Sequence, residues 1–85
     1  MALLDKGAVG RPFWLSLLHH LIIRPLTPTE LALLEHKHLS SVSRELGRLR
    51  REGLVECTEV VSRQKFYKPT QEGYILAYAS LRQGR

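Results

Sequence analysis

The sequence has little cysteine and no long apolar segment. Its one cysteine, Cys57, cannot form a disulfide within the chain, so we expect a protein of a reducing compartment such as the cytoplasm. The apolar segment from Phe13 to Ile23 is interrupted by Ser16 and is too short to cross a bilayer. The first residues lack the basic front and apolar run of a secretory signal. We therefore expect neither a disulfide-rich secreted protein nor a membrane partner.

The sequence also lacks the patterns of a metal site and of a catalytic site. Structural zinc needs four ligands, usually at paired Cys/His spacings, and the four histidines and single cysteine do not supply such pairs. The carboxylates of Glu45, Glu52, Glu56 and Glu59 stand among basic residues and form no paired acid–base set. We expect no cofactor, no metal and no enzymatic activity. Cys57 is expected to be a buried small side chain rather than a redox switch.

What the chain does have is a surplus of positive charge in a single small domain. It has 85 residues, with 13 Lys and Arg against 8 Asp and Glu, which gives a net charge of +5. This length allows one hydrophobic core, and a basic domain of this size most often has a polyanionic partner such as nucleic acid. We expect residues 1–10 to form a flexible N-terminal arm and residues 11–85 a single domain.

Helical patterns fill the first half of the chain. Pro12 opens a helix that runs to Ile23, and the segment TPTE that starts at Thr27 is a capping box for a second helix over 28–35. That helix is expected to bury Leu31, Leu34 and Ala32. After a turn at 36–39, a third helix over 40–52 places Val42, Leu46 and Leu49 on one face, with Ser40 or Ser41 as its cap and Gly53 at its end.

The second half predicts a hairpin and a last helix. Segments 54–61 and 65–68 have strand character and flank a tip at 62–64, with Leu26 as a possible very short third strand. Pro69 ends the ladder, and Thr70 caps a helix over 71–83. The predicted fold is α+β and mostly α, in the order α-α-α-β-β-α.

The third helix has an outward face suited to a duplex. At about 100° per residue, Ser40, Arg44, Gly47 and Arg51 lie opposite the apolar stripe, with Ser41 and Arg48 beside them. Arginine pairs with a guanine edge or a phosphate, and serine offers short donors near a helix N-terminus. Gly47 either admits a sugar-phosphate backbone or is a tolerated helix-weakening residue. An isolated basic face of this kind is usually only a solvated surface.

Two neighbouring features favour DNA over a solvated surface. The short capped helix, the turn and the third helix have the form of a helix-turn-helix, whose second helix enters the major groove. The hairpin carries Arg63 and Lys65 around its tip, where they would reach the flanking backbone or minor groove.

The chain resembles winged helix-turn-helix regulators of the MarR/ArsR-like kind, in particular the small archaeal ones. The matching motifs span roughly residues 28–76 in order: Glu30-Leu31-Ala32; Val42-Ser43-Arg44 with Leu46 and Leu49; Gly53-Leu54-Val55-Glu56-Cys57; and Tyr67, Thr70 and Gly73. The sequence departs from the pattern at Glu35 and His36, where members often have an apolar residue and glycine. The resemblance implies sequence-specific binding of double-stranded DNA by a dimer, with the wing on the backbone.

These patterns lead to a set of expected contacts and partners. The recognition helix at about 40–52 and the wing at about 60–66 would contact DNA through Ser40, Ser41, Ser43, Arg44, Arg48, Arg51, Arg63 and Lys65. The first and last helices are more apolar than one core needs, so a homodimer through them is expected, although burial within one chain is the alternative. Any effector is unknown, and Tyr74 and Tyr78 mark where a small ligand would bind.

The alternatives to a regulator are a winged-helix module that binds proteins and a nonspecific chromatin-associated DNA-binding protein.

Overall fold

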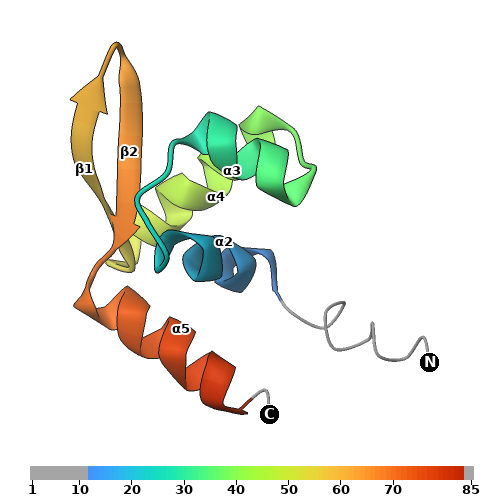
Figure 1. Cartoon of the computed structure of the whole chain (residues 1–85), viewed down its shortest axis with the longest axis vertical. Helices are drawn as coiled ribbons and strands as arrows, with labels where there is room; N and C mark the ends of the chain where they lie inside the picture. The colour runs from blue at the N-terminus through green and yellow to red at the C-terminus, as the bar shows by residue number, and fades with distance from the viewer. Residues whose placement is uncertain (1–11, 84–85) are drawn as a thin grey trace.

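The computed structural model describes residues 12–83 of the chain, so the predicted arm at 1–10 lies outside the described residues. The elements are the helices α2 (Phe13–Leu21), α3 (Pro28–Glu35) and α4 (Leu39–Arg51), the strands β1 (Val55–Val61) and β2 (Gln64–Pro69), and the helix α5 (Gln71–Gln83). The predicted order of three helices, a hairpin and a last helix is confirmed. In Figure 1 the first three helices form the body, the hairpin rises along one side, and α5 extends away below it.

One apolar core lies between α2, α3, α4 and the base of the hairpin. Leu17, Leu18 and Leu21 project into it from α2. The predicted stripe of α4 is confirmed, because Val42, Leu46 and Leu49 are all buried. The other members of this core are Leu26, Leu31, Ala32, Val55, Tyr67 and Ala77. Burial of these side chains fixes the position of α4, and therefore the direction of its outward face.

The helix α3 begins as its sequence predicts but buries less than expected. The hydroxyl of Thr27 accepts a hydrogen bond from the Glu30 amide, and the Glu30 carboxylate accepts one from the Thr27 amide. Leu31 and Ala32 are buried, but the prediction for Leu34 is wrong, because it is 50% exposed. A helix of eight residues turns only a narrow face to the core, and Leu34 lies outside that face.

The helix α4 begins one residue earlier than predicted. Its N-cap is His38, which makes no side-chain capping hydrogen bond, so the expectation that Ser40 or Ser41 caps the helix is wrong. Both serines lie inside the first turn instead. The helix ends as predicted at Gly53, whose φ of 76° is the left-handed conformation that glycine adopts without strain. The Gly53 amide donates to the Arg50 carbonyl and the Leu54 amide to the Leu49 carbonyl.

The strands β1 and β2 form a two-stranded antiparallel hairpin with one irregularity. Its register runs from Val55 opposite Pro69 to Val61 opposite Gln64, and it shifts between Cys57 and Glu59. Such a bulge increases the twist of a hairpin. Pro69 is therefore the last paired residue of β2, at the point where the prediction ends the ladder. The predicted short strand at Leu26 is a single bridge to Tyr67.

The hairpin and α5 are joined to the end of α4 at one tight junction. The Thr70 hydroxyl accepts a hydrogen bond from the Gly73 amide at 3.2 Å and donates one to the Gly53 carbonyl at 2.6 Å. The Thr70 amide donates to the Leu54 carbonyl at 3.0 Å. A Cβ atom on Gly73 would lie 2.1 Å from that same carbonyl oxygen. The predicted cap of α5 is confirmed, and Gly73 is required because backbone fills the space where a side chain would lie.

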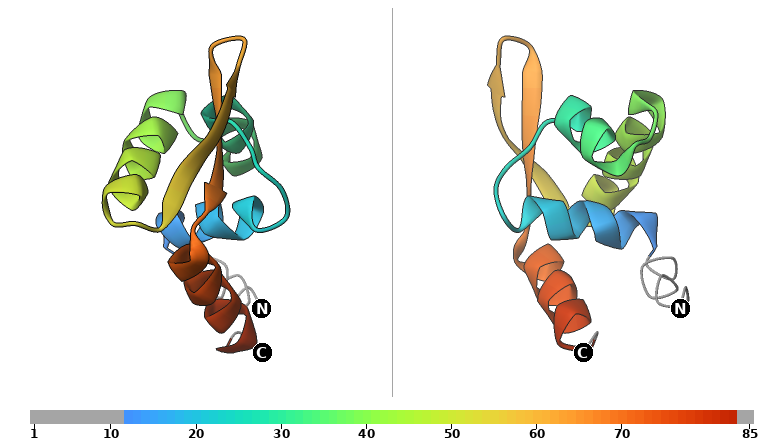
Figure 2. Two further views of the ribbon diagram at one scale, coloured as in Figure 1. Left: turned by 90° about the vertical axis from the view of Figure 1, so that its left-hand side faces the viewer. Right: turned by 45° about the vertical axis from the view of Figure 1, so that its right-hand side comes forward.

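The helix α5 projects from the body and keeps much of its apolar surface exposed. Both views of Figure 2 show it leaving the base of the hairpin. Ala77 is fully buried, whereas Ile75, Tyr78 and Leu81 are about half exposed. None of the helices between residues 12 and 83 combines the length and the apolar character needed to cross a bilayer.

Replacement of Gly73 by alanine tests the junction. We expect Gly73→Ala to lower the free energy of unfolding by about 3 kcal/mol, because a methyl group would collide with a backbone oxygen that cannot move alone. Thermal unfolding followed by circular dichroism measures the loss. The matched control is Gly47→Ala, whose Cβ would meet only the end of the Arg51 side chain at 3.6 Å. That variant should gain up to about 1 kcal/mol, and equal losses in both would contradict our account of Gly73.

Candidate nucleic-acid interface

The outward face of α4 presents the polar residues that its helical pattern predicts. Ser40, Ser43, Arg44 and Arg51 are exposed, whereas Ser41 is half-buried. The guanidinium of Arg51 lies above Gly47, because a Cβ atom at that position would be 3.6 Å from Arg51 Nη1. The exposed side chains of this face are therefore accessible to a partner, and Gly47 lies beneath the Arg51 side chain.

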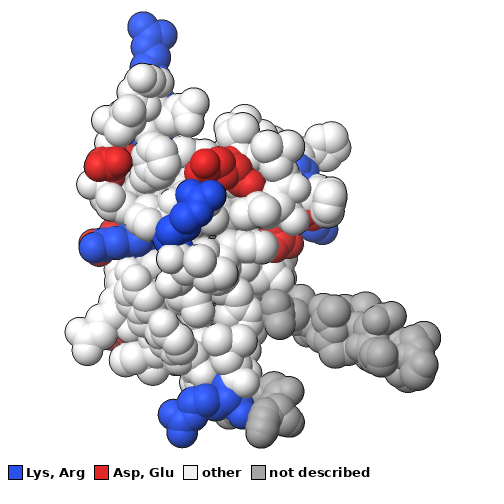
Figure 3. All heavy atoms as spheres, in the orientation of Figure 1, with Lys and Arg blue, Asp and Glu red and all other residues white. Residues whose placement is uncertain are grey.

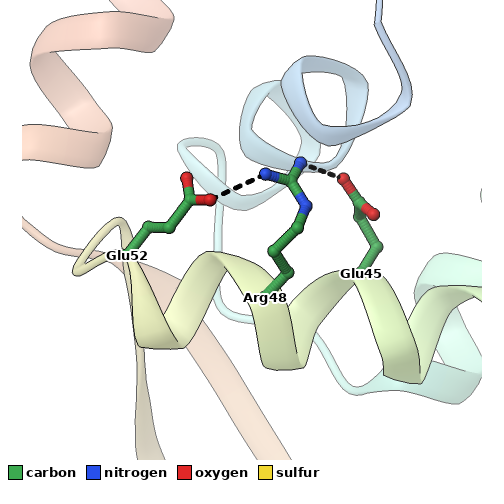
Figure 4. A network of polar contacts seen from close by, with 3 residues as sticks. All are labelled: Glu45, Arg48 and Glu52. Carbon is green, nitrogen blue, oxygen red and sulfur yellow. Dashed lines mark hydrogen bonds and ion pairs between the residues drawn. The ribbon is translucent and has the colours of Figure 1, made fainter.

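Arg48 differs from the other arginines of α4 because two carboxylates hold it. Its Nη2 donates to Glu45 Oε2 at 2.5 Å, and its Nη1 donates to Glu52 Oε2 at 2.9 Å. Figure 4 shows the guanidinium standing between the two glutamates on one flank of the helix. The hydrogen bond to Glu45, with the negative charges of both glutamates, raises the pKa of the Arg48 guanidinium. Arg48 therefore stays protonated, and the two carboxylates more than offset its charge.

The remaining predicted cations have no such partner. Arg44, Arg51, Arg63 and Lys65 make no ion pair with any residue from 12 to 83. Two of them lie on α4 and two on the hairpin, and all four are exposed. A polyanion could approach these four charges without displacing a carboxylate.

The hairpin tip is a two-residue turn. Ser62 and Arg63 have φ values of 49° and 69°, and Gln64, which we predicted to lie in the tip, belongs to β2 and pairs with Val61. Positive φ at both central positions is the pattern of a type I′ turn, which matches the twist of the strands but favours Asn and Gly. The turn carries Arg63 at the end of the hairpin. Figure 3 shows a basic side chain standing clear of the body there.

A groove joins the hairpin to the helix-turn-helix. It has a volume of about 380 Å³ and is lined by Thr27, Pro28, Thr29, Leu39, Ser43, Arg63, Gln64, Lys65 and Tyr67. The fold thus brings Ser43 to the same groove as the two basic residues of the hairpin. Sequence reasoning missed Thr29 and Gln64 at this site. Thr29 lies in the first turn of α3, where backbone amides point outward. Because such a position favours anions, it could have marked Thr29 as a candidate DNA contact from the sequence.

Two histidines occupy structural positions at or beside the end of α3. His36 ends α3 with a φ of 56°, so it occupies the left-handed position where the resemblance leads one to expect glycine. His20 of α2 lies 2.6 Å from a carboxylate oxygen of Glu35, and this contact ties α2 to the end of α3. Within the part of the chain that the structure describes, no three His, Cys, Asp or Glu side chains are grouped to hold a metal ion. Cys57 is half-buried and packs against the core.

A second and larger hollow of about 610 Å³ lies where α5 meets the base of the hairpin. The rings of Tyr74 and Tyr78 stack there with centroids 6.1 Å apart, and Ile75 lies beside them. Lys68 and Arg82 also line this hollow. Its lining is mostly apolar, as expected of a surface that takes a ligand or a partner chain.

Comparison with solved structures identifies this arrangement. The transcriptional repressor BigR from Xylella fastidiosa is 29% identical, with a TM-score of 0.71 over 92% of this chain and 76% of BigR. The adhesin competence repressor AdcR from Streptococcus pyogenes is 17% identical, with a TM-score of 0.81 over 96% of this chain and 65% of AdcR. MarR from E. coli is 22% identical, with a TM-score of 0.76 over 91% of this chain and 59% of MarR.

The chain has the winged helix-turn-helix fold. The hairpin β1–β2 is its wing, and α4 is the second helix of its helix-turn-helix. AdcR and BigR are repressors. The chain spans less than two thirds of the length of AdcR and of MarR. No protein-family model and no curated protein sequence matches it, and the likeness to small archaeal regulators stays a prediction.

The left-handed turn of the wing predicts that removal of the Arg63 side chain stabilises the fold, although it also removes a positive charge. We expect Arg63→Gly to raise the free energy of unfolding by up to about 1 kcal/mol, because glycine relieves the steric cost of a φ of 69°. Thermal unfolding measures the gain. Lys65→Ala is the matched control, since it removes a cation from the same wing at a strand position. A loss of stability in Arg63→Gly would show that the arginine side chain itself stabilises the wing.

Proposed function

We propose that the protein binds double-stranded DNA sequence-specifically and acts as a homodimeric transcriptional regulator. The observation that carries the proposal is the position of four exposed, unpaired cations. Arg44 and Arg51 lie on the outward face of α4, and Arg63 and Lys65 lie on the wing. The groove between the wing and the helix-turn-helix links the two sets through Ser43.

In this proposal each part of the surface has its own role. The recognition helix at about 40–52 enters the major groove, where Arg44 reads a base edge and Arg51 contacts base or phosphate. Ser40, Ser41 and Ser43 lie in or next to the first turn of α4, where hydroxyls and backbone amides favour phosphate oxygens. Arg63 and Lys65 grip the flanking backbone or minor groove. Arg48 joins this set only in a complex in which it leaves its two glutamates.

The role of Arg44 can be measured by DNA binding. After selection of preferred duplexes from random DNA, we expect Arg44→Ala to weaken binding to the preferred site by about 1–3 kcal/mol and to reduce discrimination at one base pair. The control is Arg24→Ala, which removes an exposed arginine that lies between α2 and α3. Fluorescence anisotropy at several salt concentrations measures both. If Arg44→Ala binds every sequence as well as the parent protein does, the proposal that Arg44 contacts a base edge is wrong.

The dimer in this proposal rests mainly on α5. Phe13, Trp14 and Leu15 of α2 pack against the core, so much of the apolar surface of α2 is used within one chain. The exposed apolar residues of α5 have no such cover within residues 12–83. A twofold dimer through this surface would place two recognition helices on successive major grooves, about 34 Å apart, and would read a palindrome.

A charge placed on α5 tests the dimer. We expect Ile75→Glu to convert a dimer into a monomer and to weaken binding to a palindromic site much more than to a half-site, because a buried carboxylate in an apolar interface is costly. Light scattering coupled to size-exclusion chromatography measures the mass. Leu33→Glu is the control, since Leu33 is also highly exposed but lies on α3. A parent protein that is monomeric at micromolar concentration and binds only half-sites would refute the dimer.

The same experiments separate the two alternatives. A protein-interaction module would not bind duplex DNA even at low salt, whereas a nonspecific chromatin-associated protein would bind random and selected fragments equally. A regulator should prefer its site by at least roughly 10³-fold.

A reducing, nucleoid-associated location in the cytoplasm is part of the proposal. An effector, if one binds, would fit the hollow at Tyr74 and Tyr78.

A further inference from the structure

The two flanks of α4 lie in surroundings of opposite charge. Relative to the line through Arg44 and Arg51, Ser43 lies about 90° toward one flank and Glu52 about 90° toward the other. The first flank faces the groove that contains Arg63 and Lys65. The second carries Glu45, Arg48 and Glu52, whose one positive and two negative charges sum to −1. A duplex on this face would therefore be attracted on the wing side and repelled on the other side.

We infer that Glu45 and Glu52 withhold Arg48 from DNA and so set the border of the DNA footprint on α4. This inference rests on the proposed function, because it assigns specificity-determining residues to the same surface. The two glutamates occupy both terminal nitrogens of the arginine, which are the atoms that would clamp a phosphate or a guanine edge. Arg48 is 39% exposed, so solvent and a phosphate could reach it if the glutamates released it.

Helix stabilisation alone is a weak reason for this arrangement. Ion pairs at i,i+3 and i,i+4 on an exposed helix surface contribute little to folding. For binding, the consequence is larger, since an unpaired arginine beside Arg44 would attract the phosphates of any sequence, and a phosphate contact adds nothing to discrimination. Repulsion of the wrong register is a recognised route to specificity. The trio therefore affects where the duplex lies more than how stable the helix is.

The test compares the parent protein with Glu45→Gln/Glu52→Gln. In the double variant Arg48 loses both charged partners, so we expect affinity for a random duplex at low salt to rise about 3- to 10-fold and the slope of log K against log salt to steepen by about 1. The preference for a selected site over random duplex should fall, because the added phosphate contact is common to all sequences. Fluorescence anisotropy on both duplexes, at four salt concentrations, gives the three quantities.

Two further variants separate withholding of Arg48 from a general change in charge. Glu45→Gln/Arg48→Gln/Glu52→Gln removes the freed arginine, and its salt slope should return to that of the parent. Glu72→Lys changes the net charge by the same +2 as the double variant but on the exposed first turn of α5, and it should leave the slope and the preference unchanged. Retention of the steeper slope in the triple variant, or the same gain from Glu72→Lys, overturns the inference.

Failure of the inference is distinguishable from failure of the proposed function. If the parent protein binds duplex DNA and selects a site, the proposed function holds whatever the variants do. The double variant could then keep the affinity for random duplex and the salt slope of the parent and show only a lower melting temperature. That result would mean that Glu45, Arg48 and Glu52 serve helix stability, and it would overturn the inference. If the parent does not bind duplex DNA at low salt, both are overturned.

Discussion

The junction around the Thr70 hydroxyl is the constraint on which the rest of the fold depends. That hydroxyl accepts from the Gly73 amide and donates to the Gly53 carbonyl, so one side chain joins the end of α4 to the start of α5. The Leu54 carbonyl accepts from the Thr70 amide and lies where a Cβ of residue 73 would be. Because the wing leaves and returns at this junction, its direction relative to α4 is fixed there.

Charge on the interface is controlled by pairing as well as by composition. The net charge of +5 gives no indication of which arginines are available. In the folded chain Arg48 is bound by two glutamates, whereas Arg44 and Arg51, on the same helix, have no ion-pair partner among the described residues. The groove beside the wing adds two more unpaired cations. The candidate interface is therefore acidic on one flank of α4 and basic at the wing.

Most features set by contacts between residues close in the sequence were predicted correctly, and features set by packing between elements were not. The capping box at Thr27 and the Val42–Leu46–Leu49 stripe were predicted because their partners lie within one or two helical turns. The burial of Leu34 was predicted wrongly, since it depends on how α3 packs against other elements. The cap of α4 was also predicted wrongly, because the Val42 amide donates to the His38 carbonyl and the helix therefore begins at Leu39. The pairing of Arg48 was within reach of the sequence, because Glu45 and Glu52 are three and four residues away.

The sequence by itself determined the order of the elements, the buried face of α4 and the left-handed end at Gly53, because local periodicity and backbone freedom set these features. Only the tertiary structure decided that Ser43 shares a groove with Arg63 and Lys65, that Thr29 lies beside them, and that α5 buries Ala77 in the core but leaves much of its apolar surface exposed. These relations join residues that are many positions apart, and no pattern within one helix or strand contains the geometry that brings them together. The single bridge between Leu26 and Tyr67, together with the Thr70 junction, supplies that geometry.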